Sequence, residues 1–310
     1  MNYISVNAMN ESFLKDPDGW IARGERLYSD QLVRIAAALC EHAEERPVIL
    51  LAGPSGSGKT TSALRIGRLA AQRGVTVHTI SMDNYFLPAP HHTKAVDENG
   101  NIDYESPYRL DIPLFNDHIR RIADCEEIEI PRFVFAEQKR APGKKFRRRH
   151  GEMVIFEGIH ALNPTVTGLS DAFVTGIYVS VRTRIKFGGQ MLHPSKIRLM
   201  RRLIRDKLYR ARPFTETMNM FDSVERGENL YIMPYKDRAL HQVDTMIPFE
   251  AAVYRSVLLP GLLEAEKTYP DFARFSDVAQ ALSLMEQVPK KSVPGDSLIR
   301  EFIGGSTLKY

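Results

Sequence analysis

The sequence predicts an α/β fold in which a parallel sheet is covered by helices on both sides. Continuous apolar runs, typical of strands buried on both faces, occur at 47–53, 75–81, 153–158, 173–181 and 243–249. Helical patterns separate most of these runs, and strands that alternate with helices pair in parallel through right-handed crossovers. The chain has 310 residues, of which 43% are hydrophobic, and this is enough apolar material to bury such a sheet.

Three regions are expected along the chain. Residues 1–45 form an N-terminal helical extension, 46–250 form the core, and 251–310 form a C-terminal helical segment packed on that core. Two segments of the core break the alternation of strands and helices. The polar-apolar alternation and turn residues of 126–150 predict a β-hairpin at the edge of the sheet, and 193–213 predicts a basic amphipathic helix.

Local signals refine two of these elements. The N-terminal extension contains a helical pattern at 28–44, for which Ser29 and Asp30 are the expected caps. In the hairpin, Pro131 lacks a backbone N–H and therefore favours an edge position. The inward residues of the N-terminal helix are expected to be Leu32, Ile35, Ala36 and Leu39.

Charge and cysteine content narrow the class of protein. The chain has 42 basic and 38 acidic side chains, so the placement of the basic residues matters more than their small excess. Cys40 and Cys125 stand far apart without a paired motif, which argues against a disulfide framework or a zinc site. No apolar run reaches the length of a transmembrane helix, and the N-terminus lacks a signal-peptide pattern. We expect a cytoplasmic protein with no membrane partner.

A glycine-rich loop between an apolar strand and a helix indicates nucleotide binding. Residues 53–60 match G-x-x-x-x-G-K-[ST], the phosphate-binding loop (P-loop). Its glycines let backbone N–H groups point at one anion, Lys59 reaches the outer phosphates, and Thr60 ligates Mg²⁺. The fold is therefore expected to be that of a P-loop NTPase that uses ATP and Mg²⁺. The expected nucleotide-binding residues of this segment are Gly53, Ser55, Gly56, Ser57, Gly58, Lys59, Thr60 and Thr61.

Two carboxylates end strands beside this loop. Ligands of open parallel sheets bind beyond the carboxyl ends of the strands, so Asp83 and Glu157 are expected to face the P-loop. Phosphoryl transfer to a hydroxyl needs a base, for which Asp83 is the candidate, and Glu157 is the candidate for holding a metal-bound water. For each residue a purely structural role stays open. Asp83 could only cap a turn, and Glu157 could only be a hydrogen-bonded carboxylate at the end of a strand.

The basic helix at 193–213 is expected to supply cations to the same site. Arg198, Arg201, Arg202 and Arg205 share one face by their three- and four-residue spacing. Like charges at this spacing repel each other, and an anion nearby would offset the repulsion. A lid that closes over ATP explains the helix better than nucleic-acid binding, so we expect no nucleic-acid partner. Arg201 is expected to contact the nucleotide and Arg205 to take part in catalysis.

Six ordered motifs resemble those of the uridine kinase and phosphoribulokinase family of P-loop kinases. They are "GPSGSGKTT", "SMDNYF", "IDYESPYRLD", "IEIPRFVF...KR", "VIFEGIHAL" and "RRLIRD". The tail "SLIREFIGGS" is similar to a larger, uridine kinase-like bacterial branch. The resemblance implies transfer of the ATP γ-phosphate to a primary hydroxyl, in uridine kinases the 5′-hydroxyl of uridine or cytidine.

The resemblance also implies roles for single residues. Asp83 falls where the family has its catalytic base, and Tyr85 in the adjoining aromatic cluster of the acceptor site. Tyr104 and Glu105 stand where the family has an aromatic residue and an acid that holds the ribose diol. The lid arginines that contact acceptor and phosphates correspond to Arg205 and to Arg210 or Arg212.

The hairpin departs from the pattern of pyrimidine-specific members. Where those carry a tyrosine and a histidine that read the base edge, this chain has Phe133 and Gln138. Phe133 can stack on a ring but cannot hydrogen-bond it, so the base recognition is altered or absent. Three functions therefore stay open: a nucleoside kinase, a kinase of another hydroxyl acceptor such as a sugar or polyol, and an ATP-hydrolysing regulatory protein. The formation of a homo-oligomer is also left open.

Overall fold

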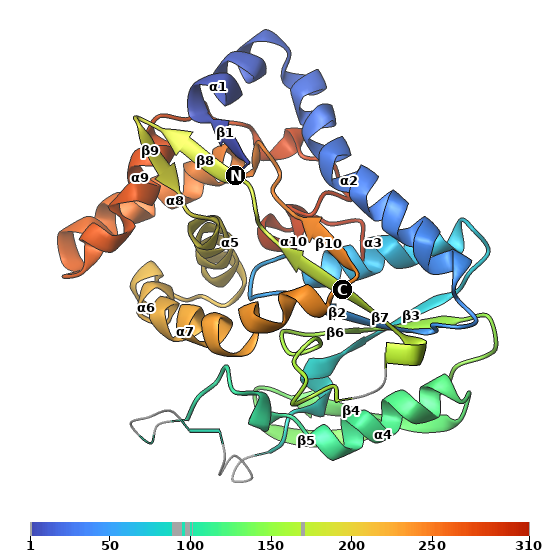
Figure 1. The fold of residues 1–310 in the computed structure, drawn as a ribbon. Helices are drawn as coiled ribbons and strands as arrows, with labels where there is room; N and C mark the ends of the chain where they lie inside the picture. Colours follow the sequence, from blue (N-terminus) through green and yellow to red (C-terminus); the bar gives the residue numbers. More distant parts are fainter. Residues whose placement is uncertain (1, 89–94, 97–99, 101, 169–170, 310) are drawn as a thin grey trace.

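The computed structural model describes residues 2–88, 95–96, 100, 102–168 and 171–309. His91 and His92, which the sequence suggests lie in a surface loop, fall outside the described residues. The centre is a five-stranded sheet in the order β10-β7-β2-β6-β3, in which all four pairings are parallel. This confirms the predicted parallel sheet (Figure 1). Its strands are β2 (Val48–Ala52), β3 (Val77–Ser81), β6 (Met153–Glu157), β7 (Val174–Ser180) and β10 (His241–Asp244).

One strand begins earlier than the sequence predicts. The expected strand at 243–249 is β10, which ends at Asp244. The Asp244 carboxylate accepts hydrogen bonds from the backbone N–H groups of Arg182, Thr183 and Met246, and this fixes a turn directly after the strand. The apolar residues that follow pack in the core from the turn that leads into the next helix.

The side chains of the sheet alternate between two hydrophobic clusters. Ile49 and Leu51 of β2 face the larger cluster, whereas Val48 and Leu50 face the smaller one. The larger cluster is covered by α2 (Pro17–Glu41), α3 (Lys59–Ala71), α5 (Pro194–Tyr209) and α8 (Glu250–Thr268), and the smaller by α4 (Ile112–Ala123) and the hairpin. Figure 1 shows these layers above and below the sheet, so helices cover both faces as predicted.

The N-terminal segment contains more than the expected helix. It forms β1 (Tyr3–Ser5), α1 (Val6–Lys15) and α2, which begins eleven residues before the expected pattern because Asp16 caps it and Pro17 occupies its first turn. The expected caps Ser29 and Asp30 were wrong, since both lie inside α2. β1 pairs in parallel with β8 (Arg184–Phe187), and β8 pairs with β9 (Gln190–Leu192), forming a second sheet that the sequence did not indicate.

The predicted hairpin is present but is not hydrogen-bonded to the central sheet in the described part of the chain. β4 (Glu127–Val134) and β5 (Lys139–Arg147) form a separate antiparallel pair. Their register shifts between Ile130 and Arg132, where Pro131 cannot donate to the ladder. Side chains hold the hairpin in place: Arg140 donates to the Asp111 carboxylate at 2.9 Å and to the Phe86 carbonyl at 3.2 Å.

The basic helix α5 is a core helix along most of its length. Five of its apolar residues are at most 1% exposed and join the larger cluster, which packs α5 against α8 and α10. The lid expected at 193–213 thus includes a helix that is packed in the core, and the residues of α5 that line the pocket beside the P-loop are Arg202 and Arg205, in its C-terminal half. The other helices are α6 (Phe214–Asn219), α7 (Phe221–Tyr231), α9 (Ser276–Ser283) and α10 (Arg300–Ile303).

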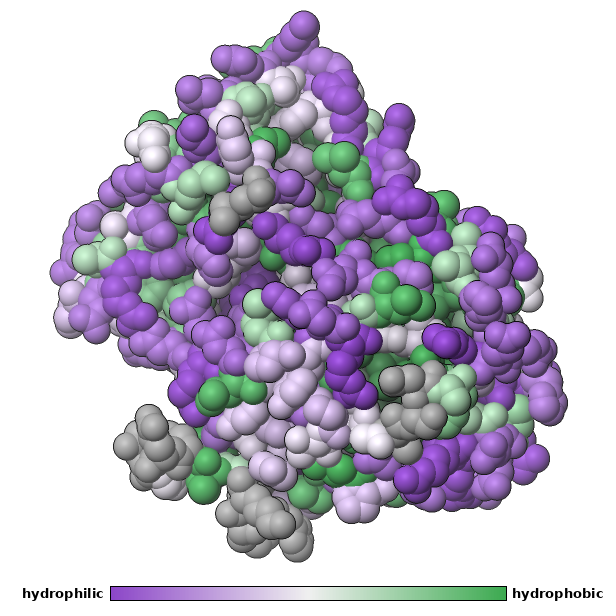
Figure 2. All heavy atoms as spheres, viewed as in Figure 1, coloured by the Kyte–Doolittle hydropathy of each residue, from purple (hydrophilic) through white to green (hydrophobic). Residues whose placement is uncertain are grey.

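The visible surface is mainly polar. Figure 2 shows hydrophilic residues over most of one face, with hydrophobic residues in small separated groups. None of the helices in the described ranges is both long enough and apolar enough to cross a bilayer.

Candidate active site

The P-loop has the backbone that its sequence pattern requires. Gly58 adopts φ +84°, a left-handed conformation that suits glycine, and no side chain caps α3. A Cβ atom at Gly53 would lie 2.0 Å from the Val179 carbonyl oxygen, so only glycine fits where the loop leaves β2. The N-terminal N–H groups of α3 are thus left for an anion or for another acceptor.

A pocket of about 910 Å³ opens between this loop, the carboxyl ends of β3 and β6, and the end of α5. Lys59 and Thr60 lie on one wall, and Asp83 and Glu157 lie at the two strand ends, as the sequence placed them. Glu105 also lines the pocket. The Lys59 Nζ donates to the Pro54 carbonyl at 3.3 Å, within its own loop.

The two strand-end carboxylates lie in one electrostatic environment. Burial raises the pKa of Asp83, against the lowering effect of Lys59, Arg109 and Arg210. The Asp83 side chain keeps solvent contact through the pocket, so the walls desolvate it only in part. Burial also raises the pKa of Glu157, opposed by Lys59 and reinforced by Asp83. A carboxylate with a raised pKa holds a transferred proton more readily than an ordinary one.

Glu105 is positioned by groups behind it. A Cβ atom at Gly227 would lie 2.2 Å from the Glu105 Cβ, so glycine in α7 makes room for this side chain. His160 is 2% exposed and hydrogen-bonds the Glu105 backbone, and burial lowers its pKa to about 4, which keeps the ring neutral. Burial raises the pKa of Glu105 itself, with Arg202 as the largest opposing charge.

Four arginines from the end of α5 and the following residues line the pocket. Arg202 donates to the Ser55 hydroxyl at 2.8 Å, which ties α5 to the P-loop. Arg205 and Arg210 both pair with the fully buried Asp206, at 2.9 and 3.3 Å. Arg212 pairs with Glu216 at 3.0 Å and completes the set.

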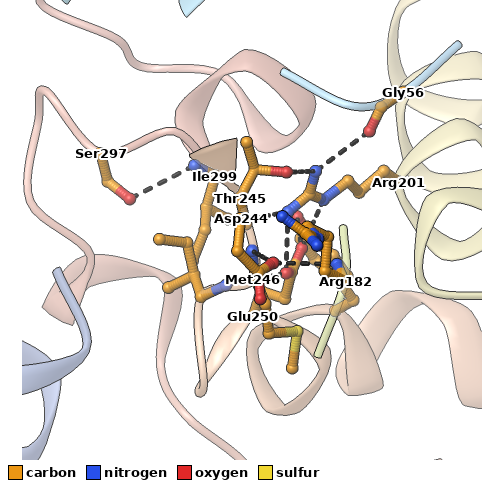
Figure 3. A network of polar contacts seen from close by, with 11 residues as sticks. Gly56, Arg182, Arg201, Asp244, Thr245, Met246, Glu250, Ser297 and Ile299 are labelled. Atoms are coloured by element: carbon orange, nitrogen blue, oxygen red, sulfur yellow. Dashed lines mark hydrogen bonds and ion pairs between the residues drawn. The ribbon is translucent and has the colours of Figure 1, made fainter. Parts of the chain in front are cut away.

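Arg201, expected at the nucleotide, does not reach the pocket. Its guanidinium is completely buried and forms ion pairs with Glu250, the shortest of 2.6 Å. It also donates to the Gly56 carbonyl at 3.0 Å and to the Thr245 carbonyl at 2.6 Å (Figure 3). Glu250 begins α8 far along the chain, so the pattern of α5 alone gave no indication of this partner. Arg201 therefore connects α8 to the back of the P-loop.

Two expected acceptor-site aromatics lie in the smaller hydrophobic cluster instead. Tyr85 is fully buried, and its hydroxyl is within 3.0 Å of His118 Nδ1. Phe133 is 6% exposed and packs edge-on against Phe86 and Phe135. The aromatic ring that lines the pocket from the hairpin is that of Phe135, two residues further along. The end of the strand explains the difference: Phe133 lies within β4 and packs in the core, whereas Phe135 lies just beyond β4, which ends at Val134, in the hairpin turn.

The remaining expected acceptor residues do line the pocket. Tyr104 is mostly exposed there, and Gln138 lies in the hairpin turn with φ +50° and donates to the Phe135 carbonyl at 2.7 Å. Of the expected nucleotide residues, Thr61 is already engaged: its hydroxyl donates to Glu301 at 2.5 Å and its N–H at 3.3 Å.

Sequence reasoning missed two charged residues of the pocket. Arg109 lines the pocket and belongs to the segment "SPYRLD". The signal that could have identified it is a charged residue close to a proline turn. Glu301 belongs to α10 near the end of the chain, and nothing local indicates that it reaches the P-loop.

Comparison with known proteins identifies a family that covers most of the core. Residues 48–249 match the model of the phosphoribulokinase / uridine kinase family. Uridine kinases from several strains of Staphylococcus aureus are 29% identical over 203 residues, which is 65% of this chain and 86% of theirs.

Likeness to solved structures is weaker. A possible uridine kinase from Bacillus stearothermophilus matches with a TM-score of 0.46 and 14% identity, over 67% of this chain and 97% of its own. D-glycerate 3-kinase from Cryptococcus neoformans matches with a TM-score of 0.39 and 13% identity, over 86% of this chain and 89% of its own. The family assignment depends instead on the match over 48–249, together with the strand order and the P-loop: the chain belongs to the phosphoribulokinase / uridine kinase family.

Proposed function

We propose that this chain transfers the γ-phosphate of Mg²⁺-ATP to a hydroxyl group of a small molecule. The observation that supports this proposal is the convergence of the P-loop, Asp83, Glu157, Glu105 and the α5 arginines on one pocket of about 910 Å³. A pocket of this volume has room for a drug-sized or larger ligand. Glu105, Tyr104 and Phe135 also line this pocket, and a protein that only hydrolyses ATP would need no such additional groups for a second substrate.

The residues at the P-loop fit a triphosphate and its metal ion. Among the described residues the buried Ser57 hydroxyl has no hydrogen-bond partner, and Gly56 and Gly58 adopt the left-handed backbone conformation that lets such a loop wrap around an anion. Thr60 and Glu157 lie together on the pocket wall and would hold Mg²⁺, Glu157 through a water. The ion, when bound, neutralises charge on the phosphates. No cluster of three metal-ligating side chains occurs in the described residues, which suits an ion held mainly by phosphate oxygens.

The chemistry assigned to the protein is positioning and proton transfer. The acceptor oxygen attacks the γ-phosphorus, the bond from that phosphorus to the bridging oxygen of ADP breaks, and the hydroxyl proton passes to the Asp83 carboxylate. Lys59, Arg205 and Arg210 stabilise the negative charge on the transferred group. Burial raises the pKa of Asp83, and the neighbouring cations oppose this effect by favouring its ionised form.

A nucleoside 5′-hydroxyl is the first candidate acceptor, because the curated relatives are named uridine kinases. Glu105 would hold the ribose diol, and Phe135 with Gln138 would face the base. The second candidate is a non-nucleoside hydroxyl compound. The burial of Phe133 favours this second candidate. Phe133 was expected to contact a nucleoside base, but its ring packs in the core.

ADP release with Mg²⁺-ATP, measured across nucleosides, sugars, polyols and hydroxy acids, tests the proposal. Asp83→Asn should reduce kcat by about 10²- to 10⁴-fold while the Kd for ATP stays nearly unchanged. Lys59→Ala should abolish turnover, because the cation on the phosphates is lost. Full turnover by either variant with an acceptor that the wild type uses would refute the proposed site.

A further inference from the structure

One cation of the pocket, Arg109, has no ion-pair partner among the described residues. Arg109 is 6% exposed and lines the pocket, and its Nε is buried without a hydrogen-bond partner. In the described part of the chain no carboxylate oxygen lies within 4.0 Å of its guanidinium nitrogens. The other pocket arginines differ, since Arg202, Arg205, Arg210 and Arg212 each have a hydrogen bond or ion pair with a protein group.

The surroundings of Arg109 desolvate it without neutralising it. Its guanidinium lies over the rings of Phe86 and Tyr104, 4.8 and 5.0 Å from their centroids. Cation–π contacts of this kind offset only part of the cost of burying an unpaired charge. Two acids near it along the chain are already bound by other groups: Asp111 pairs with Arg140 at 2.9 Å, and Asp103 is bound by Tyr231 at 2.9 Å and Arg226 at 3.1 Å. A buried guanidinium in this state is suited to a ligand that brings its own negative charge.

The position of Arg109 points to the acceptor rather than to ATP. Its guanidinium lies against the Tyr104 ring, and the acidic groups that act on it are Asp83, Glu105 and Asp103. Asp83 is the proposed base, and Tyr104 and Glu105 are residues proposed for the acceptor. By contrast, Lys59 belongs to the P-loop, and Arg202 is hydrogen-bonded to Ser55 of the same loop. The nucleotide side therefore has its own cations, and Arg109 is left for the second substrate.

We propose that the acceptor carries a carboxylate or phosphate group besides its hydroxyl, and that Arg109 binds this anionic group. The planar guanidinium fork matches both groups with two parallel hydrogen bonds. The aromatic rings that hold the fork in place reduce the entropy lost on binding. This inference rests on the proposed kinase function and selects the non-nucleoside candidate, since uridine and cytidine carry no such group.

Binding to matched pairs of compounds tests the inference without requiring the physiological acceptor. The probes are glycerol against glycerate and glycerol 3-phosphate, ribose against ribose 5-phosphate, and uridine as a neutral nucleoside. Titration calorimetry is done with saturating Mg²⁺ and a non-hydrolysable ATP analogue, so that the P-loop is occupied. We expect at least one anionic compound to bind more than tenfold tighter than its neutral counterpart. Comparison of glycerate with the two phosphorylated compounds shows whether the site prefers a carboxylate or a phosphate group.

Variants of Arg109 assign that preference to the residue. Arg109→Met should remove the anion preference, and Arg109→Lys, which keeps the charge but loses the fork, should retain only part of it. Arg120→Ala, an exposed arginine on α4, is the matched control and should leave the preference unchanged. Arg109→Met should not lower the melting temperature, because it removes a buried unpaired charge.

The possible results separate this inference from the proposed function. Equal binding of every neutral and anionic pair, or an anion preference that survives in Arg109→Met, would overturn the inference while leaving the kinase proposal intact. With a turned-over acceptor, Arg109→Met should raise the acceptor KM by tenfold or more with a smaller change in kcat. A fall in kcat with an unchanged acceptor KM would assign Arg109 to the γ-phosphate and would also overturn it. Tight anion binding without ADP release would instead reject the kinase proposal.

Discussion

At the scale of single residues, the raised pKa of Asp83 determines how activity should depend on pH. The base acts as a carboxylate, so turnover is lost as the pH falls through the pKa of this group. Burial places that pKa above the ordinary value of 3.8, and Lys59, Arg109 and Arg210 limit the rise. We therefore expect the acidic limb of the kcat/KM profile to lie above pH 3.8 and to move further up in Arg210→Ala, which removes one stabilising cation.

The pH dependence of the residual activity of two variants distinguishes the role of Asp83 from that of Glu157. Asp83→Asn should lack this acidic limb, because the titrating base is gone. Glu157→Gln should keep it and move it to lower pH, since the Asp83 and Glu157 charges repel each other. An unchanged limb in Asp83→Asn would assign the titration to another group.

At the scale of elements, the buried pair of Arg201 and Glu250 holds α5, α8 and the P-loop together. Both side chains are fully buried, and removal of one partner leaves the other charge uncompensated. Arg201→Met should lower the free energy of unfolding by about 3–5 kcal/mol, measured by urea denaturation. Arg201→Met with Glu250→Leu should lose less than the single variant, because no buried charge remains. A single variant that unfolds like the wild type would show that the pair has no structural role.

The contact between α10 and α3 leads to a prediction about nucleotide affinity. The Glu301 carboxylate accepts hydrogen bonds from the hydroxyl and N–H of Thr61 at the start of α3, where a phosphate group would otherwise find these donors. It also adds a negative charge to a pocket proposed to receive a triphosphate. Glu301→Gln should therefore bind Mg²⁺-ATP about three- to tenfold more tightly in titration calorimetry.

Glu264→Gln is the matched control for this prediction. Glu264 is exposed on α8 and pairs only with Lys267 at 3.3 Å, so its charge should not affect the Kd for ATP. Weaker ATP binding by Glu301→Gln than by this control would mean that Glu301 supports the nucleotide site rather than competing with it.

At the scale of the whole molecule, the sequence predicted what depends on local pattern. Apolar runs located β2, β6 and β7 because a strand buried on both faces has no polar alternation to obscure it. They located the partly buried edge strand β3 as well, but the run at 243–249 overlaps β10 only at its end. The P-loop follows from its glycines and Lys59. The partners of Arg201 and Thr61 could not be predicted, since Glu250 and Glu301 are 49 and 240 residues away. The burial of Tyr85 and Phe133 depends likewise on packing between distant elements.

The same distant packing places residues of α10 and the segment before it against the P-loop, which is the proposed nucleotide site. Leu298 packs so close to Gly58 that a Cβ atom at Gly58 would lie 2.6 Å from it. Phe302 is fully buried, and its ring centroid lies 5.2 Å from the Arg201 guanidinium. Phe302→Ala should therefore lower the free energy of unfolding by about 3–5 kcal/mol and weaken Mg²⁺-ATP binding, because the cavity lies behind the P-loop. Leu284→Ala, at a position 52% exposed, should change the free energy of unfolding by less than about 0.5 kcal/mol. If urea denaturation and ATP titration gave the same values for both variants, the C-terminal segment would be an appendage that the nucleotide site does not need.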